Sequence, residues 1–235
     1  IMKYNETAPA LDKRFSEFAW RIKNYTRPLG LKFLGLPCQL MGSGMAIPFE
    51  QMRSAKLHDP SIVEDMQLGM DLAAAGFPPL FCPEVEVTSW FPESGRAEKA
   101  QRKRWEHGHI GMIVGQAPGF AVKSLAKRDI KLLSLVLDLM VPPLALLAII
   151  VFFLFSSTAL AMLAGSVKIS LPLNGLLLLI FILTIFIAWL SDGRKNISLT
   201  ELLLLPILVF KKIPLYLLFM VRRQIEWVRT ERKEY

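Results

Sequence analysis

Two neighbouring acids, Glu64 and Asp65, follow the apolar residues Ile62 and Val63 and open a helix that we predict to run to about Ala75. Acids in the first turn of a helix commonly serve the helix itself, because they bind free backbone N–H groups and oppose the macrodipole. A carboxylate held ionised in a cleft can instead act as a general base that takes a proton from a hydroxyl nucleophile. The pair by itself fits both interpretations.

A second group, Gln101, Arg104 and Trp105, falls within about one turn of a helix predicted over residues 97–113. A guanidinium group binds a diphosphate through charge-assisted hydrogen bonds, and an indole ring offers a flat apolar face to a sugar ring. A basic amphipathic helix lying on lipid would show the same residue types. The order of the two groups, with an apolar region directly behind them, favours a binding site.

In this order the motifs resemble those of the processive family-2 glycosyltransferases, which include the cellulose, chitin, hyaluronan and poly-N-acetylglucosamine synthases. That family shows a Gly-Ser-containing loop, an acidic pair ending in Asp, the element Gln-x-x-Arg-Trp and then membrane helices. This chain carries Met41-Gly42-Ser43-Gly44, Val63-Glu64-Asp65 and Gln101-Arg102-Lys103-Arg104-Trp105. Val63 stands where cellulose synthases commonly have Thr, and Met41 where they often have Cys. Both departures favour an exopolysaccharide-making relative over cellulose synthase itself.

The resemblance implies a role for each matching residue. Asp65 would deprotonate the acceptor hydroxyl, and Glu64 would help to position it at the start of the helix. Gln101 and Arg104 would hold the nucleotide diphosphate leaving group. Trp105 would form the floor under the acceptor sugar.

The resemblance also implies the substrates and the setting. Gly42 and Ser43 would border the acceptor site. The enzyme would be an inverting transferase that moves a sugar from a nucleotide sugar, with a UDP-sugar as the expected donor, to a growing polysaccharide or a lipid-linked acceptor. Its catalytic domain would face the cytoplasm at a bacterial inner membrane, in a multi-pass protein that makes an exopolysaccharide.

Family members also hold a divalent cation, Mg²⁺ or Mn²⁺, on an Asp-x-Asp pair that precedes these motifs. This chain contains no Asp-x-Asp, and a hard cation bound to two phosphates needs such carboxylates. The first residue is Ile1 rather than Met, so we expect the true start, and the ligands of the cation, to lie upstream. The chain alone is then expected not to turn over. The rival hypothesis is a non-catalytic membrane scaffold or export partner that keeps a degenerate transferase domain.

The composition divides the chain near residue 131. With 53% hydrophobic residues and a mean hydropathy of +0.39, the whole is too apolar for an ordinary soluble domain. Residues 1–131 mix charge, Pro, Gly and aromatics, whereas 132–221 is dominated by Leu, Ile, Phe, Val and Ala. We therefore predict an α/β region over 1–131, the C-terminal part of a GT-A-like domain with strands at 45–47 and 80–87. An all-α membrane region over 132–235 would follow.

Within the membrane region we predict spans at about 133–164 and 171–190, because a bilayer core needs roughly 20 apolar residues as helix. Pro142-Pro143 should bend or restart the helix, so the first span can also begin nearer Val141. A third apolar run, 199–221, is broken by Pro206, by Lys211-Lys212 and by Pro214. For it we favour a re-entrant or in-plane segment.

Basic residues flank the apolar spans at 123–131, at 194–195 and in the tail 222–235, while the loop 165–170 carries one Lys. By the positive-inside rule the loop faces outward and the basic flanks face the cytoplasm. This placement accounts for the net charge of +8 by interaction with the lipid bilayer and not with nucleic acid.

Other residues that could bind a metal lack the required spacing. Cys38 and Cys82 lie far apart without CxxC spacing, which excludes a zinc module. His107 and His109 are two residues apart on a predicted helix and therefore do not share a face. We expect Asp138 to lie at the membrane interface, ahead of the first span.

Overall fold

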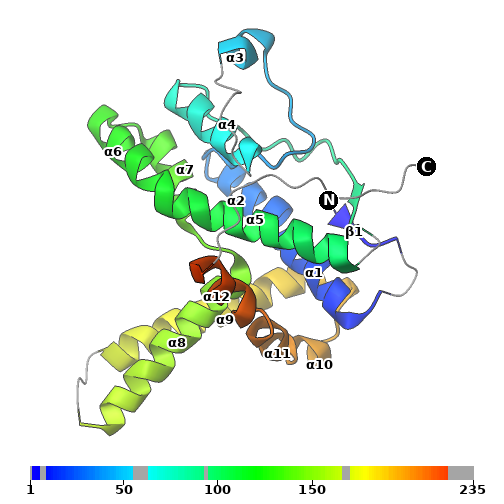
Figure 1. Cartoon of the computed structure of the whole chain (residues 1–235), viewed down its shortest axis with the longest axis vertical. Helices are drawn as coiled ribbons and strands as arrows, with labels where there is room; N and C mark the ends of the chain where they lie inside the picture. The colour runs from blue at the N-terminus through cyan, green and yellow to red at the C-terminus, as the bar shows by residue number, and fades with distance from the viewer. Residues whose placement is uncertain (1, 6–8, 55–62, 93–94, 166–169, 222–235) are drawn as a thin grey trace.

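The computed structural model describes residues 2–5, 9–54, 63–92, 95–165 and 170–221. Over these ranges the chain is mostly helical, with a compact body from which two long apolar helices extend (Figure 1). The residues 166–169 and the basic tail 222–235, on which part of the topology prediction rests, lie outside the described residues.

The sheet of the described residues is small. Strands β1 (Met2–Lys3) and β2 (Ser89–Trp90) pair in parallel, with Met2 opposite Ser89. The predicted α/β class is thus only weakly supported, and the strands predicted at 45–47 and 80–87 were wrong. Val85 and Val87 are exposed in the second run. A β-prone run forms a strand only where a neighbouring strand packs against it, and the described residues supply none there.

The N-terminal part of the body is one helical arm. Helix α1 (Leu11–Arg21), a π-helix η1 (Ile22–Thr26) and α2 (Arg27–Phe33) follow one another with helical backbone angles at both junctions. The chain then passes through the loop around Gly42 and through α3 (Phe49–Ser54).

Helix α4 (Glu64–Ala74) confirms the helix predicted from the acidic pair. Its end is confirmed as well, because Gly76 takes a φ of 96°. The Gly76 N–H donates to the carbonyl of Ala73, and the Phe77 N–H donates to that of Leu72. These two bonds satisfy carbonyls that the last turn of a helix leaves free.

The core of the body lies among α4, α5 (Gly95–Gly115), α6 (Ala117–Lys127) and α7 (Ile130–Met140). The predicted helix at 97–113 is confirmed by α5. In α7, Leu132, Leu135 and Leu139 are fully buried. These apolar residues therefore belong to the core of the body, and the first helix of the membrane region begins later than the predicted residue 133.

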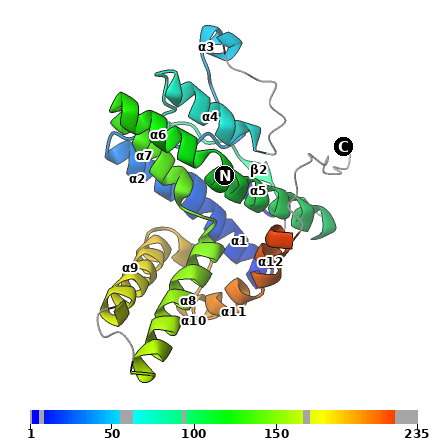
Figure 2. The same ribbon diagram turned by 60° about the vertical axis from the view of Figure 1, so that its left-hand side comes forward.

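That helix, α8 (Leu144–Leu163), follows Pro142 and Pro143, which end the preceding helical run. It packs side by side with α9 (Ser170–Ser191) in a hairpin that projects from the body (Figure 2). Both helices are long and apolar enough to cross a membrane. Most of their large apolar side chains are exposed, as a surrounding lipid phase would require.

The segment 199–219 is also long and apolar enough to cross a membrane, which makes three such segments among the described residues. After the short helix η2 (Gly193–Lys195), the structure divides the segment into α10 (Leu199–Leu202), α11 (Leu205–Phe210) and α12 (Ile213–Val221). Helices α11 and α12 contact α8 (Figure 2). The ring centroids of Phe152 and Phe210 lie 5.5 Å apart. The in-plane interpretation of this segment stays a prediction.

The helical arm is joined to the base of the hairpin. Phe15 and Phe18 of α1 pack on Ile185, Ala188 and Trp189 of α9. Around this apolar contact lie two ion pairs that link α1 to the residues after α9. Arg14–Glu201 joins N and O atoms 2.5 Å apart, and the second is Arg21–Asp192. The arm therefore has a fixed position between the hairpin and the rest of the body.

Candidate active site

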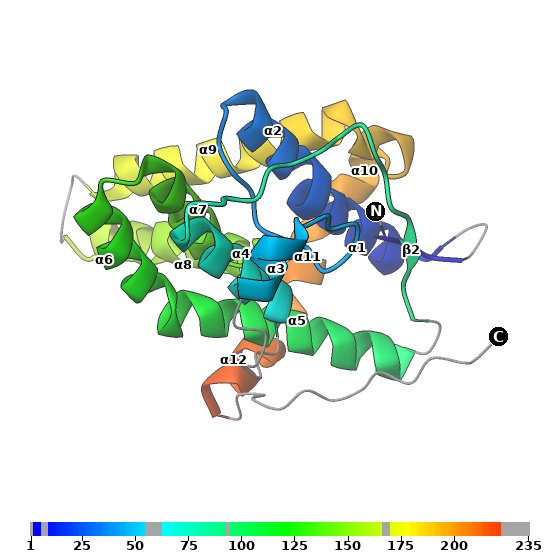
Figure 3. The same cartoon turned by 90° about the horizontal axis from the view of Figure 1, so that it is seen from above.

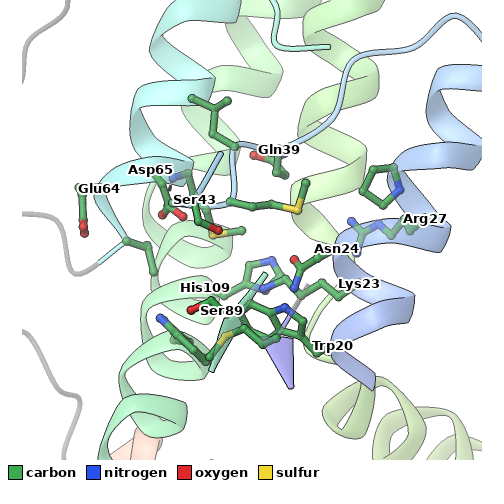
Figure 4. A pocket seen from close by; sticks show the side chains of 18 of the residues that line it. Trp20, Lys23, Asn24, Arg27, Gln39, Ser43, Glu64, Asp65, Ser89 and His109 are labelled. Carbon is green, nitrogen blue, oxygen red and sulfur yellow. Dashed lines mark hydrogen bonds between the residues drawn. The ribbon is translucent and has the colours of Figure 1, made fainter. Parts of the chain in front are cut away.

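One pocket of about 330 Å³ lies between the helical arm on one side and α4 and α5 on the other (Figure 4). Figure 3 shows how these helices are arranged. Every residue singled out from the sequence as a candidate for chemistry lines it, although these residues come from three separate segments. They are Gly42, Ser43, Glu64, Asp65, Gln101, Arg104 and Trp105. The pocket is thus the place where the candidate residues meet.

Asp65 stands in the first turn of α4 with its carboxylate directed into the pocket (Figure 4). Its Oδ1 accepts a hydrogen bond of 2.8 Å from the backbone N–H of Met66, so the carboxylate also serves the free end of its helix. Burial raises the pKa of Asp65, while the Met66 bond and the charge of Lys23 oppose the rise. A raised pKa makes a carboxylate a stronger base than an ordinary Asp.

Two glycines determine how the surroundings approach Asp65. Gly42 has a φ of 73°, and a Cβ built there would lie 3.0 Å from Oδ2 of Asp65. Gly108 of α5 lies under the start of α4, where a Cβ would meet Cγ1 of Val63 at 2.6 Å. The absence of a side chain at Gly42 lets the backbone approach the Asp65 carboxylate. The absence of a side chain at Gly108 lets α5 approach Val63, which precedes the acidic pair.

Glu64 is oriented differently from Asp65. Its side chain is exposed and points away from the residues that face the cavity (Figure 4). As the first residue of α4 it supplies negative charge at the helix N-terminus, where charge of that sign is favourable. The arrangement separates the two acids, with Asp65 facing the pocket and Glu64 at its rim.

Gln101, Arg104 and Trp105 occupy positions i, i+3 and i+4 of α5 and so share one helix face. Gln101 is only 7% exposed, and its Oε1 has no hydrogen-bond partner among the described residues. The indole of Trp105 packs against that of Trp20 with ring centroids 4.7 Å apart. A guanidinium, an amide and an aromatic surface therefore line one wall of the cavity.

The opposite wall carries cations that the sequence motifs did not indicate. Lys23 and Arg27, from η1 and α2, both line the pocket (Figure 4). Arg27 pairs with Asp138 of α7, with Nη2 and Oδ1 2.5 Å apart. Asp138 is 9% exposed and lies just ahead of the first long apolar helix, so its place at the membrane interface stays a prediction. Burial raises the pKa of Asp138, and the charge of Arg27 opposes that rise.

The two histidines of α5 point to different partners, in agreement with their spacing. Nε2 of His107 lies 3.2 Å from the carbonyl of Leu215, and Nε2 of His109 lies 2.9 Å from that of Leu139. The described residues contain no group of three His, Cys, Asp or Glu that could hold a metal ion. Cys38 and Cys82 are both free thiols.

The arrangement combines one inward carboxylate of raised basicity, cations on two walls and a pair of indoles. It suits a reaction in which a hydroxyl loses a proton and an anionic group leaves. A basic amphipathic helix on lipid would not need Gln101 and Trp105 to line a pocket with Asp65.

The comparison with known protein families agrees with this chemistry. The family model described as glycosyl transferase family group 2 matches residues 20–191, well over half of the chain and including every candidate residue. No curated protein and no solved structure matches the chain significantly. The chain therefore belongs to the family-2 glycosyltransferases, and this membership implies a nucleotide-sugar donor and an acceptor.

Proposed function

We propose that the protein is a membrane-bound, inverting glycosyltransferase that extends a polysaccharide or a lipid-linked acceptor in exopolysaccharide synthesis. The observation that carries the proposal is the meeting of the candidate residues in one pocket, with Asp65 facing inward beside Gly42. The donor is proposed to be a UDP-sugar, and the acceptor offers a hydroxyl.

In the proposed reaction Asp65 accepts the proton of the acceptor hydroxyl. The acceptor oxygen attacks the anomeric carbon from the side opposite the nucleotide, so the configuration inverts. The bond from that carbon to the diphosphate breaks, and its electron pair leaves with the nucleoside diphosphate. Arg104 and Gln101 stabilise the departing charge, since positioned cations and amide N–H groups are most effective where charge develops.

Trp105 is proposed to carry the acceptor sugar. Its indole contacts Trp20, and both rings line the pocket. Sugar rings stack on indole faces because their C–H surfaces are apolar. Asp65 and Trp105 approach the pocket from different helices, which is consistent with a hydroxyl presented to the carboxylate by a sugar on the indole.

The membrane hairpin supports a setting at a lipid bilayer. Nucleotide sugars are cytoplasmic, so the pocket is proposed to face the cytoplasm of a bacterial inner membrane. The divalent cation implied by the resemblance stays an expectation.

The test uses membranes from cells that express the full-length gene. Labelled nucleotide sugars are supplied one at a time, and the acceptor-dependent release of nucleoside diphosphate is measured. One donor should be consumed by the wild type, and Asp65→Asn should lower that rate by roughly 10² to 10⁴.

Asp71→Asn is the matched control, because Asp71 lies on the same helix but does not line the pocket. It should keep a rate close to that of the wild type. Consumption of no donor by the wild type would favour the non-catalytic scaffold. A normal rate for Asp65→Asn would return Asp65 to a capping role.

A further inference from the structure

The π-helix η1 brings two polar residues into the pocket from the helical arm. Continuous π-helical turns are rare and occur frequently at functional sites. Here Lys23 and Asn24, consecutive residues within η1, both line the pocket and face the wall that carries Asp65 (Figure 4). The unusual turn and the pocket therefore coincide.

Among the cations of this arm, Lys23 differs in its partners. Arg21 pairs with Asp192, and Arg27 pairs with Asp138. Lys23 forms no ion pair or hydrogen bond within the described ranges, although Asp65, Glu106 and Asp138 act on it at longer range. Burial lowers the pKa of Lys23, and an anionic ligand beside its amino group would stabilise the protonated form.

Three further polar atoms of the pocket are buried and lack partners in the described part of the chain: Nδ2 of Asn24, Oε1 of Gln101 and Nδ1 of His109. His109 is only 2% exposed. A buried polar atom without a partner is energetically unfavourable. Such atoms at one pocket indicate that a polar ligand completes their hydrogen bonds.

The chemistry of these atoms can be assigned. The carbonyl of Leu139 can only accept, so Nε2 of His109 carries the ring proton. Burial lowers the pKa of His109 to about 3, so the ring is neutral and its Nδ1 is an acceptor. The Nζ of Lys23 and the amide nitrogen of Asn24 are donors. The pocket thus offers two donors for an anion from the helical arm and an acceptor for a hydroxyl from α5.

We propose that Lys23 and Asn24 bind an anionic oxygen group of the acceptor, a phosphate or a carboxylate, while His109 accepts a hydrogen bond from an adjacent hydroxyl. This rests on the proposed function and specifies the acceptor class. The subsite lies beside Asp138 and Leu139 at the end of α7, directly before α8. An acceptor whose anionic group is close to the lipid would therefore reach it.

The test measures binding without turnover. Purified full-length protein in nanodiscs is titrated with decyl phosphate, decyl glucuronide and decyl glucoside, and tryptophan fluorescence is followed because Trp20 and Trp105 line the pocket. At least one anionic probe should bind about 10-fold or more tightly than decyl glucoside, as expected for charge-assisted hydrogen bonds.

The variants separate charge from shape. Lys23→Gln and Asn24→Asp should each remove the preference for anionic probes, and Lys23→Arg should keep much of it. Lys123→Gln, on the exposed surface of α6, is the matched control and should behave as the wild type. Circular dichroism checks the fold of each variant, and Asn24→Asp carries the test if Lys23→Gln does not fold.

The outcomes are distinct. A preference for decyl phosphate alone supports a lipid-linked phosphate, and a preference for decyl glucuronide alone supports an acidic sugar. Equal affinity for all three probes overturns the proposal, as does a preference that survives in the folded variants of both Lys23 and Asn24. The proposed function fails in a different assay, in which the wild type would consume none of the nucleotide sugars supplied.

Discussion

Gly108→Ala should disturb catalysis although Gly108 does not line the pocket. A Cβ at this position would lie 2.6 Å from Cγ1 and 3.3 Å from Cγ2 of Val63. Val63 is buried and directly precedes the helix that begins with Glu64 and Asp65. The substitution therefore acts on the position of Asp65 through one methyl contact.

The size of the effect follows from that distance. Carbon atoms in contact lie about 3.5–4.0 Å apart, so Val63 and the new methyl group must separate by about 1 Å. Overpacking of this kind costs about 1–3 kcal/mol of stability. A displacement of about 1 Å at a reacting group can cost about 100-fold in rate. We expect kcat to fall by about 10- to 100-fold, with nucleoside diphosphate affinity unchanged.

The assay is a double-mutant cycle. Val63→Ala removes the two methyl groups that clash and should by itself cost roughly 1.5 kcal/mol or more. In the double variant the methyl group added at position 108 occupies the space that the Val63 side chain vacates, so kcat and the thermal midpoint should both recover relative to Gly108→Ala. Gly115→Ala is the control, because Gly115 lies on the same helix and a Cβ there meets nothing within 4 Å.

Two results would refute this reasoning. A wild-type rate and thermal midpoint for Gly108→Ala would mean that α5 and the start of α4 adjust freely. The second result is additivity: if the losses in kcat and thermal midpoint of the two single variants add in the double variant, the contact between position 108 and Val63 does not displace Asp65.

Asp65→Asn should leave nucleoside diphosphate affinity within a few-fold of the wild type in calorimetry while turnover falls by roughly 10² to 10⁴. Burial raises the pKa of Asp65, and a protonated carboxyl cannot accept a proton. As the pH is lowered, kcat/KM should therefore fall, with the midpoint of the fall above the ordinary Asp pKa of about 3.9. A kcat/KM that does not change with pH in this range would contradict the role of Asp65 as base. Arg104→Lys keeps the charge but loses the two-pronged geometry, so diphosphate affinity should fall by about 10-fold or more; unchanged affinity would remove Arg104 from the donor site. For topology, an impermeant thiol reagent on intact cells should label Ala164→Cys but not Asn196→Cys, in a background without exposed native cysteine. Labelling of Thr230→Cys from outside would make 199–221 a third crossing.

The candidate residues of the motifs could be predicted from the sequence because their spacing is local. Gln101, Arg104 and Trp105 share a helix face whatever surrounds them. The ion pair of Arg27 with Asp138 could not be predicted, because its partners are 111 positions apart in sequence. The same holds for Lys23, whose place opposite Asp65 depends on how the arm packs. Long-range packing thus decides which basic residues enter the site.

The fold was predicted less well for a related physical reason. The helices at α4 and α5 have clear starts or ends in the sequence, such as the acidic pair and Gly76. The runs at 45–47 and 80–87 have β-prone residues but no described strand beside them. The apolar residues of α7 read equally well as core or as membrane span, since both environments favour Leu and Val. Composition alone therefore placed the start of the membrane region too early.

Helix α5 connects the candidate site to the last apolar segment. One face carries Gln101, Arg104 and Trp105 into the pocket. Another carries Glu106, only 11% exposed, whose Oε1 lies 2.8 Å from Nζ of Lys212. A buried carboxylate that loses its partner is strongly destabilising, so this ion pair links α5 to the turn between α11 and α12. The segment around Lys212 therefore helps to support the helix that carries Gln101, Arg104 and Trp105, so a substitution that breaks this ion pair is expected to act on the candidate site.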